Sequence, residues 1–104
     1  MSYQFTIIVP VYNEEDNLQR VEQELSNYIK IASKKTKVLF VNDGSKDKSQ
    51  ELIEKICKNS PDFTFINFEK NCGLSAAIAA GFKNVDTEFL IQIFSFNSRI
   101  CPIF

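Results

Sequence analysis

Short apolar segments alternate with segments of helical periodicity along most of this chain. The segment Phe5–Val11 is nearly continuous in apolar and β-branched residues, which is typical of a strand buried on both faces of a parallel sheet. The next segment carries the stripe of an amphipathic helix, with apolar side chains at Leu18, Val21, Leu25, Ile29 and Ala32. We expect Asn13 to cap this helix, with the carboxylates of Glu14, Glu15 and Asp16 in its first turn.

The same alternation then repeats. Val38–Val41 predicts a second buried strand, and the following helix has an apolar face made of Leu52, Ile53, Ile56 and Cys57. Either Ser45 or Asp47 is expected to cap that second helix, since both side chains carry an oxygen that accepts from a helix N–H.

Residues 63–68 predict a third strand, Ser75 opens a third helix that runs through Phe82, and residues 89–93 predict a fourth strand. Strands and helices that alternate strictly in this way indicate an α/β fold. We therefore expect a Rossmann-like, mostly parallel sheet in the order β-α-β-α-β-α-β, with right-handed crossovers.

The last stretch of the chain breaks this pattern. Residues 94–104 have neither helical nor strand periodicity, and they end on the apolar pair Ile103 and Phe104. We expect residues 1–93 to form one domain and residues 94–104 to be an aberrant tail that is foreign to it.

Composition narrows the class of protein. The 104 residues include 12 basic and 13 acidic side chains, with 44% hydrophobic residues, which fits one globular domain and excludes a disordered chain. The net charge of -1 argues against a nucleic-acid partner, because counterion release requires a basic face. No apolar run reaches the roughly 18 residues of a membrane span, and the N-terminus lacks the basic region of a signal peptide.

Histidine and cysteine usage excludes several chemistries. The chain has no histidine, which rules out histidine-based triads and histidine-ligated metals. Its three cysteines, Cys57, Cys72 and Cys101, are odd in number and widely spaced, so they match neither a disulfide framework nor a zinc site. A reduced, cytoplasmic protein is expected.

Candidate binding residues, most of them polar, gather where the predicted strands end. They are Pro10, Tyr12 and Glu14 after the first strand, Asp43 after the second, and Asn71, Gly73 and Ser75 after the third. In open α/β sheets ligands bind beyond the carboxyl ends of the strands, so these residues predict a crevice that suits a nucleotide. There Asp43 is placed to accept the imide proton of a uracil, and Lys70 or the amides near Ser75 to face phosphates.

Each of these residues also has a structural interpretation. Asn-Asp-Gly at residues 42–44 is a common turn sequence, and Gly73 is explained equally well as a turn glycine. Glu15 and Asp16 fit simple partners of a helix dipole, and Tyr12 fits a packing residue at the rim. Taken singly, no motif decides between binding and structure.

Taken together, three separated segments resemble the family-2 glycosyltransferases. They are IIVPVYNEE at residues 7–15, VNDGSKD at residues 41–47, and NCGLSAA at residues 71–77 with the continuation to residue 81. The resemblance covers residues 5–93 and implies the nucleotide-sugar-binding half of a GT-A fold. The segment after residue 14 and the alanine-rich third helix resemble the polyprenyl-phosphate sugar transferases.

The resemblance also implies roles for individual residues. In that family the first loop and the aspartate after the second strand hold the donor nucleotide, which assigns Pro10, Tyr12 and Glu14 to the nucleotide pocket and places Asp43 at the base. By the same resemblance, the segment with Asn71, Gly73 and Ser75 lines the donor site. The implied ligand is a UDP- or GDP-sugar, and the implied reaction is transfer, with inversion, to a hydroxyl or polyprenyl-phosphate acceptor, at the cytoplasmic face of a membrane in the parent protein.

One departure from the family pattern is expected to matter. After the fourth strand the family places an Asp-x-Asp motif that binds Mg²⁺ or Mn²⁺, whereas this chain has Phe94-Ser95-Phe96. Phenylalanine offers no oxygen to a hard cation, so the metal ligands of the family are absent. The family's acceptor half and general base lie further downstream. A frameshift or truncation near residue 93 would explain the missing motif, the tail and the abrupt end together, and we expect little or no transferase activity.

Other functions stay open alongside transfer. One is a non-catalytic module that binds a nucleotide, or a protein through the exposed edge of the fourth strand, where an unpaired edge also favours aggregation. A receiver domain would need an aspartate at the end of the third strand, where the chain has Asn67-Phe68-Glu69. A dinucleotide-binding domain would need G-x-G-x-x-G after the first strand, and this motif is absent.

Overall fold

The computed structural model describes residues 3–85 and 90–93 of the chain. Within them strands and helices alternate as the sequence predicted: β1 (Phe5–Val11), α1 (Leu18–Ile31), β2 (Thr36–Asn42), α2 (Ser49–Asn59), β3 (Phe63–Asn67), α3 (Leu74–Lys83) and β4 (Leu90–Ile93). Phe89 and the expected tail at residues 94–104 lie outside the described residues, so the predicted boundary at residue 93 stays a prediction.

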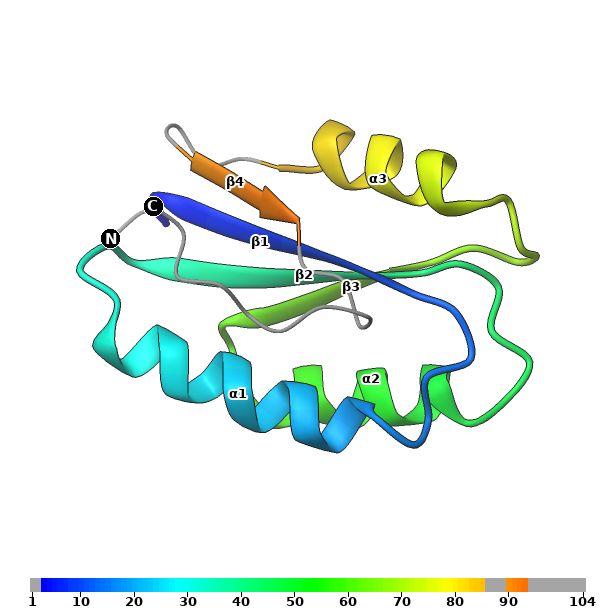
Figure 1. The fold of residues 1–104 in the computed structure, drawn as a ribbon, viewed down its shortest axis with the longest axis horizontal. Coiled ribbons are helices and arrows are strands. Elements are labelled where there is room, and N and C mark those ends of the chain that lie inside the picture. The colour runs from blue at the N-terminus through cyan, green and yellow to red at the C-terminus, as the bar shows by residue number, and fades with distance from the viewer. Residues whose placement is uncertain (1–2, 86–89, 94–104) are drawn as a thin grey trace.

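The sheet is parallel throughout and has the strand order β3-β2-β1-β4. Helices α1 and α2 cover one face of it, and α3 covers the other (Figure 1). This order confirms the α/β fold class. It also places the carboxyl ends of β1, β2 and β3 next to one another at one edge of the sheet, because parallel strands all end on the same side.

Alternate residues of β1 pack against different helical layers. Phe5, Ile7, Val9 and Val11 belong to the core cluster that includes buried residues of α1 and α2, whereas Ile8 belongs to the cluster that includes Ala77 of α3. Because both faces of the strand are covered, the sequence of β1 is apolar at nearly every position rather than at every second one. The continuous apolar runs were therefore a sound guide to buried parallel strands.

The start of α1 differs from the prediction. The helix begins at Leu18 with Asn17 as its N-cap residue, and Glu14, Glu15 and Asp16 precede the helix instead of forming its first turn. Asn13 does not cap the helix, because its backbone is left-handed with φ 52° and its Oδ1 accepts from a backbone N–H in the loop after β2. The capping predicted from the local pattern does not form, because Asn13 instead bonds to a loop that is distant in the sequence.

The start of α2 also differs in detail. Its N-cap residue is Lys48, and neither of the two residues predicted to cap it occupies that position. The prediction for Ser45 was wrong. Asp47 lies one residue before the cap, and its Oδ1 nevertheless accepts the N–H of Ser49, the first residue of the helix, at 2.8 Å.

None of the helices in the described part of the chain is both long enough and apolar enough to cross a membrane.

A tyrosine ties the N-terminal segment to the loop before β3. The Tyr3 hydroxyl donates to Oδ1 of Asp62 at 2.6 Å, and the ammonium groups of Lys35 and Lys37 lie 5.0 and 5.7 Å from the centre of its ring. The hydrogen bond to Asp62, partial burial and the nearby negative charge raise the pKa of Tyr3 to about 12. Folding therefore favours the neutral phenol, and this contribution to stability is complete below pH 10 and is lost as the pH rises through 12.

Replacing Tyr3 by phenylalanine tests this contact. We expect Tyr3→Phe to lower the free energy of unfolding by about 0.5–1 kcal/mol at pH 8, because one partly exposed hydrogen bond is lost. The difference from wild type should shrink between about pH 10 and pH 12, as the wild-type phenol ionises. Urea unfolding at several pH values measures both effects. Tyr28→Phe is the matched control, and an equal loss in the control would show that Tyr3 contributes nothing specific.

Candidate functional site

Three loops meet at the carboxyl edge of the sheet. The first loop (residues 12–17) follows β1, the second loop (residues 43–48) follows β2, and the third loop (residues 68–73) follows β3. They come from three adjacent strands and lie together at the right-hand end of the sheet in Figure 1. This is the edge at which the sequence predicted a crevice.

The carboxylate of Asp43 is the centre of this edge. The residue is only 4% exposed, and its side chain accepts three hydrogen bonds from the third loop. The donors are Cys72 N at 2.7 Å, Asn71 Nδ2 at 2.9 Å and Gly73 N at 3.1 Å. A carboxylate offers about four acceptor positions, and these bonds use three of them. Three of the predicted site residues, Asp43, Asn71 and Gly73, are thus in direct contact.

The second and third loops cross at Gly44, backbone against backbone. A Cβ atom on Gly44 would lie 2.2 Å from the carbonyl carbon of Lys70 and 2.3 Å from the nitrogen of Asn71. Gly44 also has φ +67°, a conformation that side chains rarely adopt. Residue 44 therefore has two independent requirements for glycine, its left-handed backbone and the close approach of Lys70 and Asn71.

The first loop is bonded to the second in a regular way. Three consecutive backbone N–H groups of the first loop donate to side chains of the second loop and of the first residue of α2. Asn13 donates to Ser45 Oγ at 3.0 Å, Glu14 to Ser49 Oγ at 2.8 Å, and Glu15 to Asp47 Oδ2 at 3.1 Å. Two bonds run in the opposite direction, from Lys46 N to Asn13 Oδ1 at 2.8 Å and from Lys48 N to Glu15 Oε1 at 3.1 Å. The two loops therefore behave as one unit.

The ionisation of Asp47 reflects these bonds. Partial burial acts to raise the pKa of its carboxyl group, but hydrogen bonds from the Ser49 hydroxyl and from the N–H groups of Ser49 and Glu15 outweigh it and lower the pKa below its usual value. Asp47 is consequently charged at neutral pH and keeps its full capacity to accept hydrogen bonds.

Two further polar residues of this edge are buried, and sequence reasoning missed the second of them, Ser49. Asn42 is fully buried, where its Nδ2 donates to Asn67 Oδ1 at 3.0 Å and its Oδ1 accepts from Ser45 N at 3.2 Å. Ser49 is also fully buried. The available signal was the spacing of Asp47 and Ser49, two oxygen-bearing side chains at the start of an amphipathic helix.

The other predicted residues lie at the same edge without joining the Asp43 cluster. Tyr12 is 43% exposed, Pro10 and Glu14 are half-buried, and Ser75 is the exposed second residue of α3. Among the described residues no hydrogen bond links Pro10, Tyr12 or Ser75 to Asp43. Tyr12 is thus a large, partly exposed ring on the first loop.

The described residues do not fit a divalent metal. In residues 3–85 and 90–93 there is no group of three or more histidine, cysteine, aspartate or glutamate side chains placed to hold an ion. The Asp-x-Asp motif was expected at Phe94-Ser95-Phe96, and these three residues lie outside the described part of the chain.

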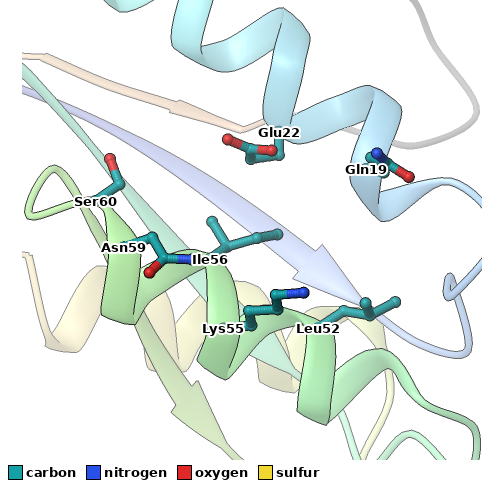
Figure 2. Close-up of a pocket in the computed structure, with 7 residues that line it drawn as sticks. All are labelled: Gln19, Glu22, Leu52, Lys55, Ile56, Asn59 and Ser60. Carbon is teal, nitrogen blue, oxygen red and sulfur yellow. The ribbon is translucent and has the colours of Figure 1, made fainter.

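A groove of about 400 Å³ lies between α1 and α2 (Figure 2). Its lining includes the apolar side chains of Leu52 and Ile56, with Glu22 and Lys55 among the polar ones. None of the residues predicted to bind the nucleotide lines it, so this groove is separate from the loop edge.

Comparison with known proteins identifies the family. The model of glycosyl transferase family 2 matches residues 6–93, which is most of the chain. The chain belongs to glycosyltransferase family 2. The dolichyl-phosphate beta-glucosyltransferase of Trichomonas vaginalis is 36% identical over 97 residues, covering 88% of this chain and 30% of that relative. The resemblance predicted from three sequence motifs is thereby confirmed.

Solved glycosyltransferases share the fold. The structure of S. aureus TarS 1–349 in complex with UDP-GlcNAc aligns with a TM-score of 0.69 at 25% identity, over 88% of this chain and 26% of that one. The mannosyltransferase of Pyrobaculum calidifontis in complex with GDP-Man and Mn²⁺ aligns with a TM-score of 0.62 at 21% identity, over 82% and 25% of the two chains. The GT-A prediction is confirmed, and the chain spans less than a third of each of these proteins.

Two glycine substitutions test how the loops cross. We expect Gly44→Ala to cost more than about 3 kcal/mol of unfolding free energy, because a new Cβ overlaps the backbone of the third loop as well as straining φ. Gly73→Ala is the matched variant, since Gly73 has φ +101° with open space around it, and strain alone costs about 1–3 kcal/mol. Urea unfolding measures both. Equal losses of unfolding free energy in the two variants would show that the close approach of the third loop to Gly44 adds nothing to the strain in φ.

Proposed function

We propose that this chain binds the nucleotide part of a nucleotide-diphosphate sugar at the edge formed by the three loops. The observation that carries the proposal is the buried Asp43 carboxylate, which the third loop holds through three of its about four acceptor positions, while the first loop carries the exposed ring of Tyr12. In this proposal Asp43 accepts the imide or amide N–H of the base, and Tyr12 packs on the face of the base. Pro10 and Glu14 border the pocket.

The third loop and the start of α3 are proposed to face the diphosphate. Gly73 is the N-cap residue of α3, and Ser75 stands exposed in the first turn. The first N–H groups of a helix have no partner within the helix and favour negative charge. The amide nitrogen of the exposed Asn71 donates to the backbone oxygen and to Oδ2 of Asp43, which holds the third loop at this position. We assign this side of the edge to the phosphates and the sugar.

The relatives support the class of ligand. One solved neighbour holds UDP-GlcNAc and another holds GDP-Man with Mn²⁺, and a curated relative is a dolichyl-phosphate glucosyltransferase. We infer a UDP- or GDP-sugar as donor and, for the parent protein, a hydroxyl or polyprenyl-phosphate acceptor at the cytoplasmic face of a membrane. Residues 1–93 are proposed as the nucleotide-binding unit.

Sugar transfer requires a metal site that nucleotide binding does not require. In the intact family a Mg²⁺ or Mn²⁺ ion stabilises the leaving diphosphate, and this role requires oxygen ligands. Phe94 and Phe96 offer none at the position of Asp-x-Asp. We propose that this chain binds its nucleotide with little or no turnover, so it acts as a non-catalytic module derived from a glycosyltransferase.

Nucleotide binding is tested with UDP and GDP. We expect saturable binding of at least one of them without metal, and a loss of about tenfold in affinity for Tyr12→Ala, because stacking of a base on an aromatic ring contributes about 1–3 kcal/mol. Isothermal titration calorimetry measures the affinity. Phe82→Ala is the matched control, since Phe82 is a similarly exposed ring on α3, with 49% exposure against 43% for Tyr12. Wild-type protein that binds neither nucleotide would contradict the proposed function.

Catalysis is tested with UDP-GlcNAc and GDP-mannose in the presence of Mn²⁺. We expect no release of UDP or GDP, and nucleotide affinity that Mn²⁺ does not change. The double variant Phe94→Asp with Phe96→Asp should make the affinity increase with Mn²⁺, because two carboxylates supply oxygen ligands for a hard cation. Clear turnover by the wild-type chain would show that the proposal of inactivity is wrong.

A further inference from the structure

Two residues after β2 have a role that the proposed nucleotide contacts do not include. The carboxylate of Asp47 spans two loops, since Oδ1 accepts Ser49 N at 2.8 Å and Oδ2 accepts Glu15 N at 3.1 Å. The hydroxyl oxygen of Ser49 accepts Glu14 N at 2.8 Å. Asp47 and Ser49 together therefore hold two consecutive peptide groups of the first loop.

These bonds are more than the cap of a helix. The contact between Asp47 and Ser49 N is local and satisfies the start of α2. The contacts with Glu14 and Glu15 instead join residues separated by 35 and 32 positions, and the formation of α2 requires neither of them. These two contacts therefore restrain the backbone of the first loop.

The first loop needs this support because of its backbone. Asn13, between Tyr12 and Glu14, has φ 52°, the left-handed conformation that non-glycine residues seldom adopt without stabilising contacts. The N–H groups of the next two residues point to Ser49 and Asp47. Without these acceptors the loop is free to continue into the helical turn that the sequence pattern favours, which would move the Tyr12 ring.

Neither residue is among those proposed to touch the nucleotide. Ser49 is fully buried, and each carboxylate oxygen of Asp47 accepts a backbone N–H group. We propose that Asp47 and Ser49 are positioning residues, which fix the first loop in the shape that presents Tyr12 and Glu14 to the base of the nucleotide. This inference rests on the proposed function.

The test combines nucleotide affinity with amide hydrogen exchange on the full chain. The variants Asp47→Asn and Ser49→Ala remove acceptors, Ser49→Thr restores the hydroxyl, and Asp16→Asn is the control for loss of a charge in the same loop. We expect the two removals to weaken binding of UDP or GDP about tenfold, comparable to one lost hydrogen bond. Exchange should accelerate at the amides of Glu14 and Glu15 while the amides of β1 stay protected. Ser49→Thr and Asp16→Asn should resemble wild type.

The outcomes separate this inference from the proposed function. Wild-type binding with unchanged affinity in Asp47→Asn and Ser49→Ala would overturn the positioning role alone. Faster exchange throughout β1 would attribute any lost affinity to general instability and would also overturn it. If wild type binds neither UDP nor GDP, the proposed function fails, and unchanged exchange at Glu14 and Glu15 would in that case overturn the loop coupling itself.

Discussion

The buried carboxylate of Asp43 is the constraint on which the loop edge depends. A charge removed from water costs several kcal/mol unless hydrogen bonds replace its hydration. The third loop supplies these bonds through the backbone of Cys72 and Gly73 and the side chain of Asn71. To do so it must approach the end of β2 so closely that only glycine fits at residue 44. The start of α3 is set by the same contact, because Gly73 is both a donor to Asp43 and the N-cap residue.

The first loop is organised by the same principle. Here too backbone N–H groups supply the donors, and the side chains of Ser45, Asp47 and Ser49 supply the acceptors. Backbone N–H groups that leave a strand must find partners, and those of the first loop find them in a neighbouring loop rather than in a helix. This is why α1 begins at Leu18 and why three acidic residues that resemble a first helical turn lie outside it.

The resulting edge combines buried and exposed groups. The hydrogen-bonded side chains of Asn42, Asp43 and Ser49 are buried, whereas the Tyr12 ring and the first two residues of α3 are exposed. Ligand sites on α/β sheets have this form, with the fold fixing the loops and the loops providing the chemistry. The chain belongs to glycosyltransferase family 2, and two solved structures that share its fold hold UDP-GlcNAc and GDP-Man.

The sequence by itself determined the elements and their alternation. The apolar runs at Phe5–Val11 and Val38–Val41 indicated buried parallel strands. Both faces of these strands pack against helices, and a strand covered on both faces is apolar at nearly every position. The motifs around Asp43, Asn71 and Gly73 also marked residues that the fold brings into contact. Only the tertiary structure decided the strand order β3-β2-β1-β4, the left-handed Asn13 and the bridging role of Asp47. These features depend on hydrogen bonds between residues about thirty positions apart, and no local pattern encodes which distant acceptor a backbone N–H will find.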